Sequence, residues 1–274
     1  MNCKKNYIRE LWIIMTLALT VVVLACQSGN RHVSSQELVV MSLTDSVYGG
    51  NEYNNYYMAS FTIDVPISGP KALVNSLLVV VNRELYNACE GCAHFDDNVV
   101  AFSKKEMFSD DAEFLLNHYM EKYKSIIKDS LWREYGFYLK MEAQTETFVT
   151  YGLEYDYCGA SCGSEKHYYT FNKHDGHLIS EIINHNNLIR FFEDFPEYNS
   201  IGADPWSGTS GWKFYPEDEF DNSCFGLLDD HFSLVIAGYG NHFLLIDFPY
   251  SKIITYLSSD VQKLVELKCK KDIQ

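Results

Sequence analysis

The stretch from Thr147 to Asn172 constrains the fold most, because two runs rich in aromatic and β-branched residues flank a short turn, CGASCG. Successive side chains in a strand point to opposite faces. Val149, Tyr151 and Leu153 therefore share one apolar face of the first run. The pattern predicts a long β-hairpin whose apolar face needs a covering layer and whose turn two cysteines are placed to pin.

The rest of the chain alternates between strand and helix patterns. Alternation predicts a strand over 56–67, and apolar residues at i, i+4 and i+8 predict an amphipathic helix over 71–86. Further expected elements are a helix over 109–129 capped by Ser109, a strand over 139–144, a helix over 177–195 ended by Pro196, strands over 224–228, 232–237 and 242–248, and a helix from 249 to about 257. This mixture predicts an α+β fold, in which a mixed or antiparallel sheet with a long central hairpin is packed by amphipathic helices.

The N-terminus carries the features of an export signal. Lys4, Lys5 and Arg9 precede an apolar run over 11–25, which ends in VLA before Cys26. This ending resembles a bacterial lipoprotein signal, in which the cysteine is lipidated and becomes the new N-terminus. The alternative is a membrane-anchoring helix, but the run is shorter than the ~20 residues that such a helix needs. We expect an exported protein, lipid-anchored to the cell envelope. The residue after the cysteine is not Asp, which favours the outer membrane of a diderm bacterium.

The chain is strongly acidic, with 22 Lys and Arg against 37 Asp and Glu, a net charge of −15. No cluster of Lys and Arg suggests a surface that tracks phosphates, so nucleic acid is not an expected partner. An acidic exported domain can attract a cationic protein, since complementary fields raise encounter rates. Solubility alone is the competing explanation for the charge.

Six cysteines remain once Cys3 leaves with the signal and Cys26 is lipidated. They are Cys89, Cys92, Cys158, Cys162, Cys224 and Cys269. An even number in an exported chain favours disulfides, although sequence cannot choose among the pairings. The simplest set joins the two local pairs and leaves Cys224 with Cys269. The C-x-x-C and C-x-x-x-C spacings also leave open a zinc site or a redox-active pair.

The order of elements after residue 147 resembles a known family. The segments GASCGSEKHYYTFN and GLLDDHFSLVIAGYGNHFLLIDFPYSKIITYL, with the Asp175-Gly176 turn between them, are similar to the exported domain of the lysozyme-sensing anti-sigma factor (RsiV-like) family. That domain also occurs beside some polysaccharide deacetylase domains. We expect no counterpart here of the sigma-binding segment, membrane helix or deacetylase domain of those proteins. The resemblance implies a recognition part alone, which binds a muramidase-type protein or a wall glycan.

The signal, the element order and the resemblance together divide the chain into five segments. These are a lipoprotein signal peptide over 1–25, a lipid anchor and tether over 26–55, an N-terminal α/β segment over 56–145, a C-terminal RsiV-like domain over 146–260 and a tail over 261–274.

No motif predicts catalysis, because the sequence lacks G-x-S-x-G, H-E-x-x-H, a phosphate loop and a dinucleotide fingerprint. We assign no catalytic residue, metal ligand or cofactor. The candidate ligand contacts lie in or next to the long loop over 199–219. They are Trp206, Trp212, Tyr215, Glu217, Asp218 and Glu219. The alternative is that the aromatic rings tuck back onto the sheet.

The favoured hypothesis is a non-enzymatic binding or sensing module of the cell envelope. Its expected partner is a lysozyme-like cationic protein, or peptidoglycan or another glycan, and the lipid anchor provides contact with the membrane. One alternative is a carbohydrate-active enzyme or an accessory protein of glycan handling. The other is a purely structural envelope lipoprotein.

Overall fold

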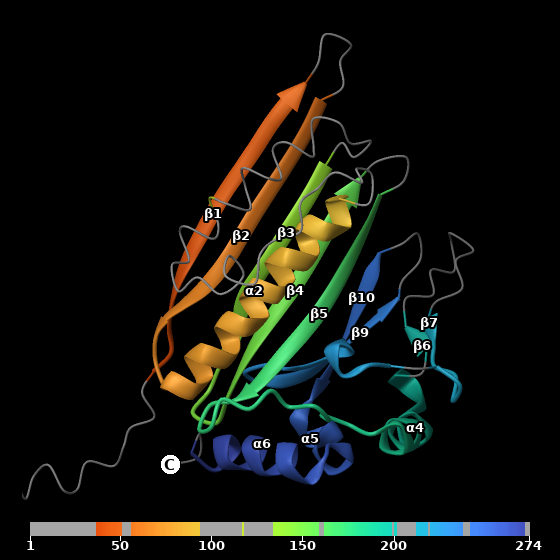
Figure 1. The fold of residues 1–274 in the computed structure, drawn as a ribbon. Helices are drawn as coiled ribbons and strands as arrows, with labels where there is room; N and C mark the ends of the chain where they lie inside the picture. Colours follow the sequence, from red (N-terminus) through yellow and green to blue (C-terminus); the bar gives the residue numbers. More distant parts are fainter. Residues whose placement is uncertain are drawn as a thin grey trace, which may run out of the picture. The chain divides into compact units, whose positions relative to one another are not determined.

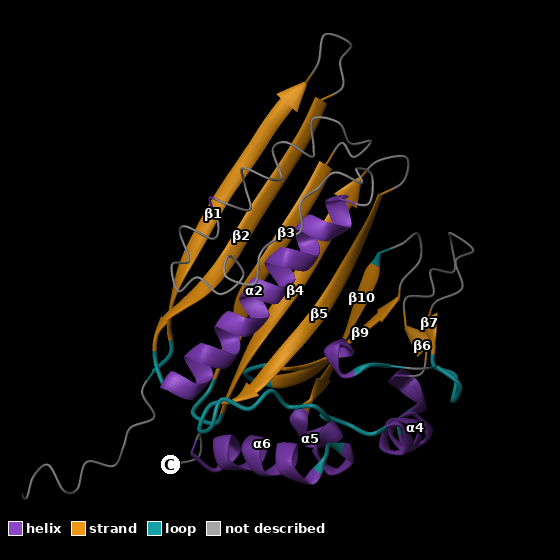
Figure 2. Ribbon diagram, in the orientation of Figure 1, coloured by secondary structure: helices purple, strands orange, loops and turns teal. Residues whose placement is uncertain are grey.

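The computed structural model describes residues 37–50, 56–93, 117, 134–158, 162–198, 200–201, 212–218, 220–237 and 242–271. From Leu38 onward these residues belong to one compact unit. It contains a five-stranded mixed sheet, a three-stranded antiparallel sheet, a two-stranded ribbon and, within the described part, four α-helices (Figures 1 and 2). The predicted α+β class is confirmed.

The five-stranded sheet has the strand order β1-β2-β3-β4-β5. Its strands are β1 (Val39–Gly50), β2 (Tyr56–Ser68), β3 (Glu134–Gln144), β4 (Phe148–Cys158) and β5 (Cys162–Asn172). Neighbouring strands are antiparallel except β2 and β3, which run parallel. The predicted hairpin is therefore present as β4 and β5, with Tyr151 paired to Tyr169 near its middle.

One face of this sheet is covered by helix α2 (Lys71–Ala93), which runs along the strands in Figure 1. The helix follows the break at Gly69 and Pro70, where the Val74 amide donates to the Pro70 carbonyl at 3.0 Å. The predicted apolar stripe is confirmed and packs against the sheet. Its core members are Leu73, Leu77, Val80 and Val81 on the helix, with Ala59, Phe61, Ile63, Val65, Phe137, Leu139, Val149, Tyr151 and Leu153 on the strands.

A second core lies between the hairpin and the C-terminal elements. The three-stranded sheet has the order β10-β9-β8, and the ribbon pairs β6 with β7. The bounds are α4 (His185–Asp194), β6 (Ser200–Ile201), β7 (Trp212–Lys213), β8 (Phe225–Leu227), β9 (His231–Ala237), β10 (Phe243–Pro249), α5 (Tyr250–Ile253) and α6 (Ser259–Lys271). Phe191 of α4 is central, since its ring lies 4.8 Å from that of Phe248 and 5.3 Å from that of Tyr256. Aromatic packing thus joins α4 to β10 and the C-terminal helices.

The helix predicted over 177–195 is wrong in its first part. Residues 177–179 pair instead with the end of β5, because Asn172 N donates to His177 O at 2.8 Å and Ile179 N donates to Thr170 O at 2.9 Å. The helix begins only at His185, where the Asn184 side chain accepts the Asn187 amide. Backbone pairing with β5 therefore overrides the helical spacing of the apolar residues.

Three other predictions differ from the structure or fall outside it. Residues 39–50 form strand β1, although they lie in the segment over 26–55 that we expected to be a tether. The tail contains helix α6, whose Val261 and Val265 are buried in the second core. The helix predicted over 109–129, with its Ser109 cap, lies outside the described residues apart from residue 117. Within the described part, no helix combines the length and apolar character needed to cross a bilayer.

The Tyr151 hydroxyl gives a test of the first core. It is fully buried and has no hydrogen-bond partner among the described residues, and burial together with the nearby Asp64 raises its pKa. Because a buried unpaired hydroxyl costs free energy, Tyr151→Phe should raise the free energy of unfolding by about 1 kcal/mol in urea titrations at pH 7. In the folded state this phenol keeps its proton, whereas in the unfolded chain it ionises above about pH 10. The free energy of unfolding of the wild type should therefore fall as the pH rises above about 10, and that of Tyr151→Phe should fall less.

Tyr168→Phe is the matched control, because the Tyr168 hydroxyl has a partner in Ser233 at 3.4 Å. It should lower the free energy of unfolding by up to about 1 kcal/mol. A Tyr151→Phe variant less stable than Tyr168→Phe would contradict the assignment of an unpaired hydroxyl.

Candidate functional site

The six cysteines after Cys26 divide into one disulfide, one free thiol and three whose side chains are not described. Cys158 and Cys162 form a disulfide that joins the ends of β4 and β5, as the hairpin pattern suggested. Cys224 is a free thiol and not the expected partner of Cys269, whose side chain lies outside the described part. Burial, followed by the charge of Asp221, raises the Cys224 pKa to about 11, so this thiol is a poor nucleophile at neutral pH.

Cys89 and Cys92 fall within the last turns of α2, which extends beyond the end predicted for this helix at residue 86. Their side chains are not described, so their pairing remains a prediction. Among the described residues, no group of three or more His, Cys, Asp or Glu side chains is arranged to hold a metal ion.

The predicted contact patch is only partly within the described structure. Trp206 and Glu219 lie outside it, and of Trp212 only the backbone, in β7, is described. Tyr215, Glu217 and Asp218 lie together in one tight turn, in which the Tyr215 amide donates to Asp218 Oδ2 at 2.9 Å. Tyr215 is 49% exposed and Glu217 is exposed.

Two contacts with α4 hold this turn in place. His185 Nε2 lies 2.9 Å from the Pro216 carbonyl oxygen, which ties the turn to the start of α4. Phe214, just before the turn, is buried and its ring stacks on Phe192 with centroids 4.4 Å apart. One aromatic ring of this segment therefore does pack back onto the core, while the next stays largely exposed.

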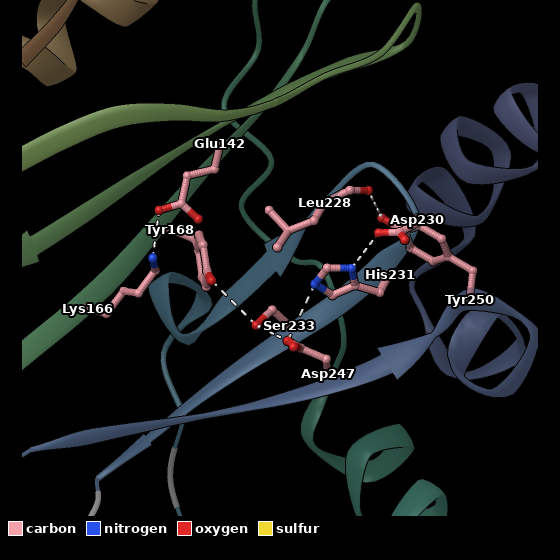
Figure 3. Close-up of polar contacts among 9 residues, drawn as sticks. All are labelled: Glu142, Lys166, Tyr168, Leu228, Asp230, His231, Ser233, Asp247 and Tyr250. Carbon is pink, nitrogen blue, oxygen red and sulfur yellow. Dashed lines mark hydrogen bonds and ion pairs between the residues drawn. The ribbon is translucent and has the colours of Figure 1, made fainter.

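A chain of polar side chains connects the two sheets, and sequence reasoning missed most of it (Figure 3). It begins at Lys166 of β5, which is almost buried and whose Nζ lies 2.6 Å from Glu142 Oε1 and 3.7 Å from Glu154 Oε2. Gly152 of β4 makes this bridge possible, because a Cβ there would stand 2.0 Å from Glu142 Oε1. The Glu142 side chain thus lies across β4 to reach the ammonium group.

The chain continues from Lys166 to the second sheet. Its ammonium group lies 5.2 Å from the centre of the Tyr168 ring, a cation–π contact. The Tyr168 hydroxyl lies 3.4 Å from Ser233 Oγ of β9, and that hydroxyl donates to Asp247 Oδ1 of β10 at 2.8 Å. Burial is the main cause that raises the Tyr168 pKa, so this phenol keeps its proton at neutral pH.

The exposed end of the chain is a histidine between two carboxylates. His231 Nδ1 lies 2.6 Å from Asp230 Oδ1, and its Nε2 lies 3.5 Å from Asp247 Oδ1. The side chains of Asp230 and Asp247 are 89% and 56% exposed, whereas that of His231 is 30% exposed. The neighbouring Leu228 carbonyl accepts the Tyr250 hydroxyl at 2.8 Å, which fixes the turn between β8 and β9. We call Asp230, His231 and Asp247 the acidic cluster.

Ser233 lies next to the acidic cluster, so a serine, a histidine and a carboxylate are in proximity, but not in the arrangement of a nucleophilic triad. Ser233 is fully buried, and its hydroxyl donates to Asp247 and not to His231. A nucleophilic serine needs a base that takes its proton and an exposed oxygen. The cluster can instead present carboxylates to a cationic group of another molecule, because neighbouring groups hold these carboxylates in place.

One signal for this site is visible in the sequence, namely the adjacent acids Asp229 and Asp230 between two predicted strands. A second signal was available in Ser233, a polar residue in the otherwise apolar strand HFSLVIA. The register of β9 against β10 places Ser233 opposite Asp247 and His231 opposite Pro249. Only this register brings the three polar side chains together.

Comparisons with known proteins show the fold and not the activity. No family model matches the chain, and no curated protein matches it. A solved structure of a DUF3298 family member from Bacteroides fragilis NCTC 9343 is similar, with 13% identity and a TM-score of 0.51 over 86% of this chain and 99% of that chain. A DUF3298 family protein from Pseudomonas aeruginosa PAO1 has 10% identity and a TM-score of 0.47, over 83% and 97%. DUF3298 is related to RsiV-like domains, so the Bacteroides structure agrees with the resemblance at the level of the fold.

The ion pair at the buried end of the polar chain can be tested by substitution. Lys166→Met leaves Glu142 and Glu154 without their cation, and should lower the free energy of unfolding by about 1–3 kcal/mol, since Glu142 is only partly shielded from water. Lys263→Met is the control, because Lys263 and Asp260 form an ion pair in water on α6. Urea titration should show no measurable change for the control. Equal effects of the two substitutions would show that the Lys166 pair is not stabilising.

Proposed function

We propose that this chain is a non-enzymatic recognition module of the cell envelope that binds a cationic protein through the acidic cluster. The observation that carries the proposal is Asp247, a half-exposed carboxylate fixed by the Ser233 hydroxyl and flanked by His231. A carboxylate held in one orientation loses little entropy when it pairs with a Lys or Arg side chain.

The charge of the whole chain supports this reading. A net charge of −15 attracts a cationic partner from a distance and raises the rate of encounter. Asp229, next to the cluster, is also exposed and adds to the local negative potential. The family resemblance in the sequence points to a muramidase-type protein, which makes a lysozyme the first partner to test.

The proposal also includes export of the chain and its attachment to the cell envelope. The signal-like N-terminus, with lipidation at Cys26, would tether the module at the envelope, where wall-directed cationic proteins arrive. Binding there would serve to sense such a protein or to sequester it. The carbohydrate-active alternative is less well supported, because neither the sequence nor the acidic cluster offers a catalytic arrangement.

Binding of lysozyme to the mature chain tests the proposal. Isothermal titration calorimetry should show saturable binding whose affinity falls as the salt concentration rises, because exposed charges are screened. Asp247→Asn removes the charge and keeps the shape, and should weaken binding by about 1 kcal/mol, or about fivefold in Kd. The folded state should be preserved, which thermal denaturation checks.

Asp260→Asn is the matched control, since it removes one exposed carboxylate from α6 and leaves the acidic cluster intact. It should leave the Kd unchanged. Cytochrome c, another cationic protein, distinguishes specific recognition from general attraction. Absence of lysozyme binding, or equal weakening by Asp260→Asn, would refute the assignment to the acidic cluster. Release of sugar products from peptidoglycan by the purified chain would favour the enzymatic alternative instead.

A further inference from the structure

The five-stranded sheet has two edge strands, β5 and β1, and they differ in what lies beside them. Residues 177–179 pair with the end of β5. Further along the same strand, Ser223 Oγ lies 2.9 Å from His167 Nδ1. By contrast, β1 lies at the outer side of the sheet in Figure 1, and among the described residues its backbone pairs with β2 alone. Within the described part, the outer edge of β1 is therefore open to a further strand.

Two observations show which backbone groups of β1 point away from β2. In an antiparallel pair, residues that exchange both hydrogen bonds with the partner strand alternate with residues whose N–H and C=O groups point outward. Val40 pairs with Pro66, which has no amide hydrogen and cannot exchange both bonds. The Ser46 amide donates to Asp45 Oδ1 at 2.7 Å and not to β2. By alternation, the residues with outward groups are Val40, Ser42, Thr44, Ser46 and Tyr48.

Two local features limit the open part of this edge to residues 40–44. At one end, the pairing register with β2 shifts between Val39 and Val40, which marks an irregularity in the strand pair. At the other end, the Ser46 amide is already bonded to the Asp45 carboxylate. The outward N–H and C=O groups between these limits belong to Val40, Ser42 and Thr44. A regular stretch of this kind can form a short antiparallel ladder with a strand from another molecule.

The first half of β1 lacks the residues that usually keep a sheet edge from pairing. Such residues are charged ones, above all lysine, and proline. Residues 39–44 read VVMSLT and contain neither. Val39 is 44% exposed and Met41 is 37% exposed, so apolar side chains lie in water beside the edge. An uncharged segment that is rich in apolar residues and has no proline favours strand addition.

This stretch is complementary to a second copy of itself. A two-fold axis at Ser42 sets this residue opposite the partner's Ser42, and sets Val40 opposite the partner's Thr44. The residues with outward groups then face one another and can exchange hydrogen bonds. Between them, Met41 lies opposite the partner's Leu43. Leu43 packs against the first core, and Met41 shares its face by alternation, so these apolar pairs extend the core across the axis.

Charge and hydrogen bonding both favour this register over its neighbour. Asp45 is the one charged residue of β1. With the axis at Ser42, Asp45 lies opposite the partner's Val39, so the two Asp45 carboxylates are about 20 Å apart along the strands, beyond the Debye length of about 8 Å. An axis at Thr44 would reduce this separation to about 7 Å. It would also require the Ser46 amide, which is already occupied.

We propose that the chain forms a weak homodimer, in which residues 40–44 of β1 pair antiparallel with the same residues of a second copy. The two five-stranded sheets then join edge to edge. A ladder this short lies at the low end of interface sizes, so association is weak and reversible. Two copies with a net charge of −15 each repel one another, so salt should strengthen the dimer. The proposal does not depend on the acidic cluster, to which β1 contributes no residue.

Sedimentation velocity of the folded chain tests the proposal. As the protein concentration rises to about 1 mM, the average sedimentation coefficient should change from that of a monomer towards that of a dimer. The dimer Kd should be smaller at high salt, which is the opposite of the salt dependence expected for lysozyme binding. Thr44→Pro removes an outward amide hydrogen, places its ring against the partner strand and leaves the hydrogen bonds to β2 intact. It should weaken dimerisation by about tenfold or more.

Ser46→Pro is the matched control, because it places proline at an outward amide of the same strand but outside residues 40–44. It should leave the dimer Kd unchanged. Met41→Lys tests the apolar pair without proline and should weaken the dimer, whereas Asp45→Ala frees the Ser46 amide and should tighten it. Thermal denaturation shows whether each variant is folded.

Two results would overturn the proposal. The first is a wild-type chain that stays monomeric at every concentration and salt level, which would leave the edge of β1 to a strand of another protein. The second is an equal effect of Thr44→Pro and Ser46→Pro in folded variants, because the dimer would then not use residues 40–44. Neither result bears on lysozyme binding, which calorimetry measures separately.

Discussion

Burial of both faces of the β4–β5 hairpin is the constraint on which the rest of the structure depends. On one face, Val149, Tyr151 and Leu153 form the core beneath α2. On the other, Phe148 belongs to the aromatic core, and the buried Thr150 donates its hydroxyl to the Leu227 carbonyl of β8 at 2.6 Å. A slip of one residue in the register would exchange the two sets of side chains, placing Thr150 under the helix. One hairpin thus fixes the positions of two cores at once.

The sequence predicted those elements whose periodicity agrees with their final environment. The hairpin and α2 are examples, because alternation and helical spacing each mark a face that is buried in the structure. Residues 177–184 show the opposite case, since Leu178 and Ile182 have helical spacing but the backbone nearby pairs with β5. Most of β1 was also not predicted as a strand, because Asp45 interrupts the alternation of apolar and hydroxyl residues that marks it.

The candidate site was less predictable than the fold, because it depends on register between distant strands. Asp230 was visible as an acid in a turn, but Tyr168, Ser233 and Asp247 come from three strands and meet only after the two sheets pack together. The packing is close, since a Cβ on Gly226 of β8 would lie 2.9 Å from the Tyr168 ring. No sequence pattern encodes that contact. Of the contact patch expected near residue 215, the structure describes the turn with Tyr215, Glu217 and Asp218, and the patch stays a prediction.

The polar chain also bears on how the acidic cluster would meet a ligand. Lys166 and Tyr168 connect the five-stranded sheet to Ser233 and Asp247 beneath the acidic cluster. These links are an almost buried ion pair, a ring packed on Gly226 and a buried serine. A ligand can shift a conformational equilibrium only as far as it binds two alternative arrangements with different affinity. Because a buried hydroxyl within this packed frame already orients Asp247, a cationic group that pairs with it loses little free energy to reorganisation of the site.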